Sequence, residues 1–220
     1  MIRAAIFDMD GLMFDTEKYY DEEWERLIVE FGYEADPRMA EKLRGTNGTL
    51  MEGLLLEMYP GLDVKKFVKT TMERVEKITE EGIDVKPGLY EILDYLKEKN
   101  VRMIIASGSL KKLVVRNLKN LHLDTYFEDV VTAEDVPQSK PAPDIYLEAS
   151  RRLQMKPEDC CVLEDSSNGI RGAVRAGCLP VMVPDVENPA ADVREACAGI
   201  YDSLLDVMEA MKKGELPVIS

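Results

Sequence analysis

Five short and almost wholly apolar runs recur along the chain of 220 residues, at positions 4–7, 101–106, 130–133, 160–163 and 181–183. Apolar runs of this length are typical of strands that are buried on both faces of a sheet. Helical patterns lie between most of the runs, and strands that alternate with helices form a parallel sheet covered by helices on both faces. The chain is therefore predicted to have an α/β fold with a doubly wound parallel sheet.

The intervals between these runs contain amphipathic segments, which predict helices over residues 89–99, 110–121, 144–153 and 169–176. In the first of these helices, Leu89, Ile92, Leu93 and Leu96 recur at the spacing that places side chains on one helical face. Each predicted helix can therefore cover the sheet with one apolar stripe.

Residues 16–86 depart from this alternation, because they contain no strand-like run. Their apolar residues instead predict amphipathic helices, which include residues 38–43, 50–58 and 64–81. We therefore expect two domains. Residues 1–15 and 87–220 form the sheet domain, and residues 16–86 form a helical-bundle cap domain inserted after the first strand.

The overall charge and the apolar runs exclude some classes of partner. The formal net charge of -14 argues against a nucleic-acid binder, which needs basic residues to neutralise phosphates. The chain has no apolar run long enough to span a bilayer, and its first aspartate, Asp8, comes too early for a signal peptide. We expect a cytoplasmic protein without nucleic-acid or membrane partners, as a monomer or weak homodimer.

Acidic residues follow two of the predicted strands directly. Asp8 and Asp10 end the first strand, and Glu164 and Asp165 end the fourth. The carboxyl ends of parallel strands meet at one edge of a sheet, where ligands bind. Carboxylates crowded on one side need a cation or a shared proton, and a set of oxygen ligands suits Mg²⁺. Zinc is disfavoured, because His122 is the single histidine and the four cysteines lack a zinc-binding spacing.

Two further segments could bind an anion. Ser107 and Gly108 lie at a strand-to-helix turn, where free backbone N–H groups attract phosphate; a plain helix cap is the alternative. Lys140 stands between Ser139 and Pro141, just before a predicted helix, so it could supply a fixed positive charge rather than act as a surface lysine.

Together these segments resemble the haloacid dehalogenase-like hydrolase superfamily over essentially the whole chain. The four motifs of that superfamily occur in order: Asp8-Met9-Asp10-Gly11, Ser107, Lys140-Pro141 and Glu164-Asp165. The helical insert is similar to the cap of the subfamily that contains β-phosphoglucomutase and phosphoglycolate phosphatase. The resemblance implies a Rossmann-like core and phosphoryl transfer.

The resemblance also implies a role for each motif. Asp8 attacks phosphorus to form an aspartyl-phosphate, and Asp10 protonates the leaving oxygen and later deprotonates the attacking water. Mg²⁺ is held by the Asp8 carboxylate, the Asp10 carbonyl and Asp165, with Glu164 as a direct or water-mediated ligand. In the same comparison, the transferring phosphoryl group is bound by Ser107, Lys140 and the backbone near Gly108.

The cap of such enzymes selects the substrate. Thr16 lies where the chain enters the predicted cap, and Lys42-Leu43-Arg44-Gly45 is similar to the family's cap loop. The expected substrate contacts are therefore Arg44, Thr46 and Asn47 of this loop, together with Thr16.

We predict a phosphatase that acts on a small, sugar-phosphate-like metabolite. A β-phosphoglucomutase-like phosphomutase is the alternative. Such mutases carry a histidine soon after the first motif, where this chain has Tyr19-Tyr20, and His122 lies far downstream. A catalytically retired phospho-ligand binder would be expected to have lost a motif residue, and none is missing.

Overall fold

The computed structural model describes residues 1–44, 46, 48–186 and 188–216. Within it the chain forms two compact units. One unit comprises Met1–Phe14 together with Asp84–Ser220, and the other comprises Asp15–Ile83. They are called the sheet unit and the helical unit below, and each is described by itself.

In the described residues, the sheet unit contains one sheet of six strands, in the order β3-β2-β1-β4-β5-β6. The strands are β1 (Ala4–Phe7), β2 (Arg102–Ser107), β3 (Val130–Thr132), β4 (Cys160–Glu164), β5 (Leu179–Met182) and β6 (Gly199–Ile200). All pairings are parallel; Phe7 of β1, for example, lies opposite Ile105 of β2 and Leu163 of β4. The prediction of an α/β fold with a parallel sheet is confirmed.

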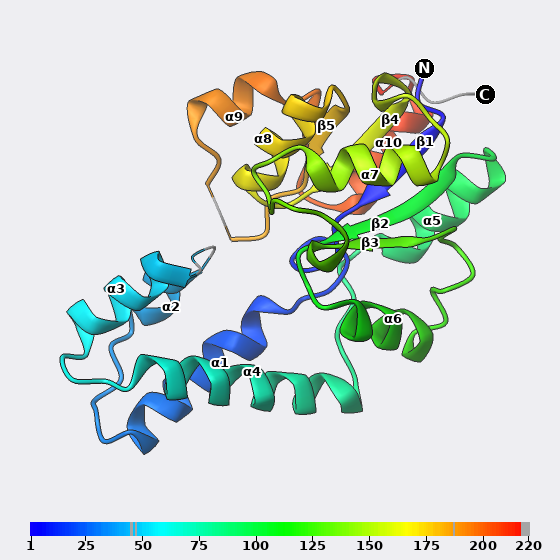
Figure 1. The fold of residues 1–220 in the computed structure, drawn as a ribbon. Coiled ribbons are helices and arrows are strands. Elements are labelled where there is room, and N and C mark those ends of the chain that lie inside the picture. Colours follow the sequence, from blue (N-terminus) through cyan, green and yellow to red (C-terminus); the bar gives the residue numbers. More distant parts are fainter. Residues whose placement is uncertain (45, 47, 187, 217–220) are drawn as a thin grey trace. The chain divides into compact units, whose positions relative to one another are not determined.

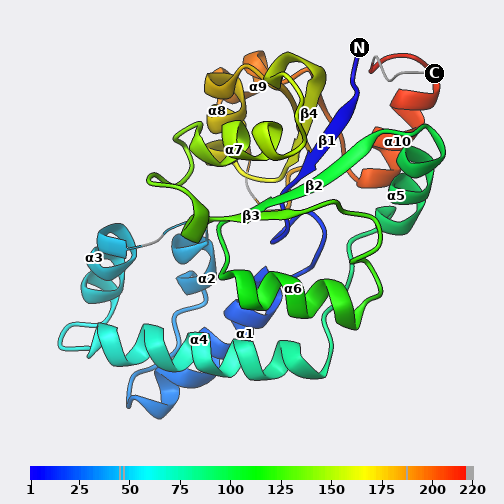
Figure 2. The same ribbon diagram turned by 45° about the vertical axis from the view of Figure 1, so that its right-hand side comes forward.

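Helices cover both faces of this sheet (Figures 1 and 2). They are α5 (Leu89–Glu98), α6 (Lys111–Asn120), α7 (Asp144–Arg152), α8 (Ser167–Ala176), α9 (Ala191–Ala196) and α10 (Leu204–Lys212), with short 3-10 turns at Ala133–Asp135 and Pro157–Asp159. The helices α5 and α10 pack together on one face, and α7 and α8 pack together on the other.

Alternate residues of the central strands supply the core beneath α7 and α8. Ile6, Ile104 and Val162 point to that face, where they join Ile145 and Ala173 of the two helices in one buried cluster. The spacing is two residues along each strand, as the pleat requires. Because both faces of the sheet are buried in this way, its central strands contain almost no polar residue until they end.

Three elements were absent from the prediction. The strand β6 has only two residues, which is too short for any periodic signal. Helix α9 has six residues and buries only Val193. Helix α10 is different: Leu204, Val207 and Met211 form a buried stripe at helical spacing, so its signal was present in the sequence.

The helical unit contains α1 (Glu17–Glu30), α2 (Met39–Leu43), α3 (Gly48–Met58) and α4 (Val64–Glu81). Helices α1 and α4 make the most extensive contact, and Trp24, Leu55 and Phe67 lie in the buried core that the four helices share. Asp63 caps α4 by accepting a hydrogen bond from the backbone N–H of Lys66. No helix in the described part of the chain is both long and apolar enough to cross a membrane.

Candidate active site

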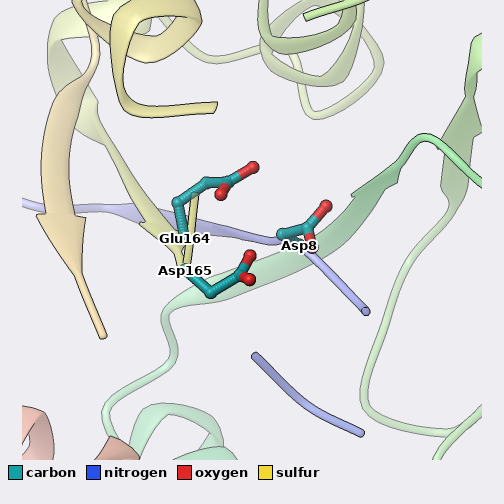
Figure 3. A group of neighbouring side chains, drawn as sticks. All are labelled: Asp8, Glu164 and Asp165. Atoms are coloured by element: carbon teal, nitrogen blue, oxygen red, sulfur yellow. The ribbon is translucent and has the colours of Figure 1, made fainter. Parts of the chain in front are cut away.

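The acidic residues predicted at the sheet edge meet where the order of the strands reverses. Strands β1 and β4 are neighbours, although the chain forms β2 and β3 between them. Asp8 directly follows β1, Glu164 ends β4, and Asp165 follows it. Oxygen atoms of the three carboxylates lie within 4.8 Å of one another. Figure 3 shows the three side chains at the ends of their strands. This position, at the carboxyl ends of the strands and at the switch point, is where open α/β sheets bind ligands.

Lys140 joins two of these acids. Its Nζ donates to Oδ1 of Asp8 and to Oε1 of Glu164, at 2.5 Å in both cases. The lysine comes from the loop before α7, and its side chain is only 13% exposed. Asp8 and Glu164 thus share one ammonium group, and the carboxylate of Asp165 lies beside them.

Glu164 is held by four donors. Its Oε1 accepts from Lys140 and from the buried Tyr146 hydroxyl at 3.0 Å, and its Oε2 accepts from the backbone N–H and the hydroxyl of Ser166, both at 2.8 Å. A Cβ at position 169 would lie 1.8 Å from Oε1, so this close approach requires Gly169. Glu164 is therefore bound tightly by the protein itself, which leaves it little capacity to ligate an ion.

The pKa values follow from this arrangement. Burial raises the pKa of Asp8 to about 8, with help from Glu164 and Asp10 and against the attraction of Lys140. Burial also raises the pKa of Asp165 well above its usual range, assisted by the charges of Glu164 and Asp8. Burial opposes ionisation of Glu164 as well, but Lys140 and the Ser166 donors outweigh it and lower the pKa of Glu164. The positive charge of Lys140 therefore compensates the buried carboxylates of Asp8 and Asp165 only in part.

A hard divalent cation would supply the positive charge that is missing at these two carboxylates. Asp8 offers a buried oxygen ligand and Asp165 a half-buried one, and both residues carry raised pKa values; these properties fit Mg²⁺. Within the described residues, the group of carboxylates contains no histidine or cysteine. The donor set therefore fits the predicted magnesium ion and does not fit zinc.

Asp10 lies beside the end of β2. Its Oδ2 accepts a hydrogen bond of 2.7 Å from the Ser109 hydroxyl and a longer one, 3.5 Å, from Ser107. Ser107 in turn accepts from the backbone N–H of Ser109 at 3.0 Å, which fixes the turn. Gly108 lies between the two serines and is exposed. A side chain at that position would meet no neighbour within 4 Å, so packing does not require glycine there.

The expected substrate contacts belong to the helical unit. Thr16 is buried, and its hydroxyl has no hydrogen-bond partner among the described residues. Arg44 forms a bidentate ion pair with Asp21 of α1. Asn47 lies outside the described residues. The roles of these three residues and of Thr46 stay predictions.

Comparisons with known proteins show the family of this chain. The family model described as haloacid dehalogenase-like hydrolase matches residues 5–183 of the chain. The chain belongs to this hydrolase family. The predicted family and the prediction of a phosphatase enzyme are both confirmed.

Individual members of the family match over most of their length. The phosphorylated carbohydrates phosphatase of Thermotoga maritima is 32% identical over 180 residues, which are 80% of this chain and 82% of that protein. Hexitol phosphatase B of Escherichia coli is 30% identical over 84% of this chain and 85% of its own. A solved structure from Thermotoga maritima, provisionally described as a beta-phosphoglucomutase, superposes with a TM-score of 0.81 and 27% identity. It covers 96% of this chain and 99% of that one.

Three polar residues at the site were absent from the prediction. Ser109 donates to Asp10, while Tyr146 and Ser166 hold Glu164. Ser109 lies two residues after Ser107 in the same turn, so its place in the sequence was a usable signal. Tyr146 had none, because a tyrosine inside an amphipathic helix normally indicates core packing.

Proposed function

We propose that this chain is a Mg²⁺-dependent phosphatase that hydrolyses a small phosphorylated carbohydrate or polyol through an aspartyl-phosphate on Asp8. The observation that carries the proposal is the position of Asp8. Its carboxylate lies at the switch point of the sheet, where it accepts a hydrogen bond from the ammonium group of Lys140 and lies within 4.8 Å of a carboxylate oxygen of Asp165. A buried carboxylate with a cationic partner and a neighbouring metal-type ligand suits attack on an anionic phosphoryl group.

In the first step an oxygen of Asp8 forms a bond to phosphorus, while the bond from phosphorus to the ester oxygen breaks. Asp10, protonated at the start, gives its proton to that departing oxygen and releases the alcohol. The Ser109 hydroxyl bond holds the Asp10 carboxyl group in one orientation for this transfer.

In the second step Asp10 takes a proton from a water molecule, whose oxygen attacks phosphorus. The bond between phosphorus and Asp8 breaks, which frees inorganic phosphate and restores the Asp8 carboxylate. Lys140 and the Ser107 turn face the phosphoryl oxygens throughout and offset their negative charge.

Asp8 and Asp165, with the backbone carbonyl of Asp10, are the residues proposed to hold the magnesium ion. When bound, the ion offsets the charge of the phosphoryl group and of the crowded carboxylates. We assign Glu164 to anchoring Lys140 rather than to ligating the ion, because four donors already occupy its oxygens.

The substrate class rests on the relatives. The Thermotoga maritima phosphatase is named for phosphorylated carbohydrates and the Escherichia coli enzyme for hexitol phosphates. Both are at least 30% identical to this chain over most of its length. Sugar and polyol monophosphates are therefore the compounds to assay first.

The test is a panel of sugar, polyol and nucleotide monophosphates, assayed for phosphate release with Mg²⁺ and with EDTA. We expect turnover of at least one sugar or polyol phosphate, dependent on Mg²⁺, and its loss in Asp8→Asn. Full turnover by Asp8→Asn would disprove the covalent mechanism. Tight binding of phosphorylated ligands without any turnover would instead favour a binding protein.

A phosphomutase is the second candidate, because the solved structure from Thermotoga maritima is described as a beta-phosphoglucomutase. The single histidine of the chain argues against it. His122 follows α6, whose first turn comes after the Ser107 turn, so the length of that helix separates it from the site. Incubation with sugar 1-phosphates separates the two activities: the phosphatase releases phosphate, whereas a mutase forms the 6-phosphate.

A further inference from the structure

Asp185 is a buried acid that the proposed mechanism does not use. It lies in the loop after β5, the strand next to β4, and its side chain is only 9% exposed. Its Oδ1 forms an ion pair with Nζ of Lys86. Its Oδ2 is buried, and in the described part of the chain it has no hydrogen-bond partner. A buried carboxylate oxygen without a donor is destabilising and calls for a partner from outside the protein.

That free oxygen faces the acidic cluster. Gly11, the residue after Asp10, has a φ of +79°, and a Cβ built on it would lie 2.3 Å from Oδ2 of Asp165 and 3.5 Å from Oδ2 of Asp185. Both oxygens therefore line the same narrow space beside Gly11. Any side chain at position 11 would fill this space, in addition to the strain of the positive φ.

Asp185 does not belong to the group of carboxylates close enough to share an ion directly. Within the described residues, that group consists of Asp8, Glu164 and Asp165. Magnesium in proteins keeps several of its waters, and these waters donate hydrogen bonds to acceptors around the site. A fixed acceptor just outside the ligand set is what such a hydration shell needs.

We propose that Asp185 is an outer acceptor of the metal site, with its Oδ2 receiving a hydrogen bond from the hydration shell of the bound cation. Lys86 occupies Oδ1 and so fixes the orientation of the carboxylate. This inference rests on the magnesium site of the proposed function. It makes Asp185 a positioning residue for the metal, and predicts an effect on metal affinity that can be measured without any substrate.

The test is isothermal titration of the folded protein with MgCl₂, without substrate. Asp185→Asn keeps the size of the side chain, but its amide must turn NH₂ either towards Lys86 or towards the hydration shell, so one of the two contacts is lost. We expect Mg²⁺ to bind about tenfold more weakly, within the range seen when groups around a metal site are changed. Asp165→Asn, which removes the negative charge of a proposed ligand, is expected to abolish measurable binding.

The matched control is Asp192→Asn. Asp192 belongs to the same C-terminal part of the chain and pairs with an arginine, Arg171, but it lies on the surface at 60% side-chain exposure. The control removes the same charge and is expected to bind Mg²⁺ as the wild type does. If circular dichroism shows that Asp185→Asn does not fold, Asp185→Ala replaces it. The same loss of Mg²⁺ affinity is expected, and alanine has no NH₂ group that could face the ammonium group of Lys86.

The outcomes separate the two proposals. Wild-type affinity in Asp185→Asn, with binding lost in Asp165→Asn, overturns the role of Asp185 and leaves the magnesium site standing. If Asp192→Asn loses as much Mg²⁺ affinity as Asp185→Asn, the effect comes from net charge, and the proposed role of Asp185 is also overturned. A wild-type protein that binds no Mg²⁺ overturns the proposed metal site, and the role of Asp185 with it.

Discussion

An exposed ion pair of the helical unit and the acidic cluster of the sheet unit differ in how they use charged residues. In the helical unit, Arg74 on α4 pairs with the exposed Glu30 of α1, above an apolar core. In the sheet unit, Asp8, Lys140 and Glu164 are all buried at the end of two central strands. Exposed pairs are screened by water and contribute little to stability, whereas buried groups shift one another's pKa values strongly. The exposed pair of the helical unit therefore contributes only slightly to stability, whereas the buried charges of the sheet unit are suited to catalysis.

Removal of the proposed nucleophile is expected to have the largest effect. Asp8→Asn keeps the shape of the side chain but loses the attacking oxygen anion, so turnover should fall by about 10³-fold or more. Phosphate release from the best substrate of the panel measures this. The variant should fold, because the amide carries no buried charge; a turnover within tenfold of wild type would contradict the difference drawn between the units.

Lys140→Met should reduce both turnover and stability. It leaves the buried carboxylates of Asp8 and Glu164 without their cation, which we expect to lower the free energy of unfolding by about 3–5 kcal/mol. Chemical denaturation at pH 7.5 without metal measures the loss. Part of it should be recovered near pH 5, because Glu164, whose pKa Lys140 holds down in the wild type, takes up a proton more readily once that lysine is gone. A pH-independent loss would show that lost packing, rather than charge, is responsible.

The metal-free protein should become less stable as pH rises. The pKa of Asp8 is about 8 in the folded protein and near 3.8 when unfolded, so the folded state binds the extra proton between these values. The free energy of unfolding in EDTA should therefore fall between about pH 4 and pH 8. Asp165 acts in the same direction. Asp8→Asn should flatten the slope, and a stability that instead rises over this range would refute the assignment.

Magnesium should stabilise the protein more at high pH than at low pH, because it binds the ionised carboxylates. Its stabilising effect, measured as the rise in melting temperature on adding MgCl₂ after EDTA treatment, is expected to be larger at pH 8 than at pH 5.5. Equal shifts at both pH values would mean that Mg²⁺ binds away from Asp8 and Asp165.

Tyr146→Phe tests a smaller part of the buried network. The change removes the hydroxyl that donates to Glu164 but keeps the ring, whose centroid lies 5.4 Å from Nζ of Lys140. A hydrogen bond to a charged group is worth about 1.5–3 kcal/mol, so denaturation should show a loss of that order. Tyr146→Leu removes the ring contact as well and should lose more; equal losses would show that the hydroxyl alone matters.

The smallest effect is expected in the helical unit. Glu30→Gln breaks the exposed pair with Arg74 and should change the free energy of unfolding by less than about 0.5 kcal/mol, with turnover unchanged. Chemical denaturation measures the free energy of unfolding, and the phosphatase assay measures turnover. A loss comparable to that of Lys140→Met would remove the distinction between the two units.

Much of the fold could be predicted, because its signals are local. The apolar runs at 4–7 and 160–163 correspond to β1 and β4, and the helical pattern at 64–81 corresponds to α4. The two-residue strand β6 could not be predicted, since its pairing with β5 depends on a neighbour that is distant in the sequence. The prediction that Asp8, Glu164 and Asp165 share a site rested on a rule about sheet edges, and the structure places their oxygens together.

The sequence by itself determined the α/β class, the order of the motifs and the family, because apolar periodicity and short motifs are properties of neighbouring residues. Only the tertiary structure decided which donors each acidic residue contacts. It assigned four donors to Glu164, put Tyr146 beneath Lys140, and left one oxygen of Asp185 free beside Gly11. The physical reason is that these contacts join residues far apart in the chain, and burial shifts pKa values only once the surrounding side chains exclude water.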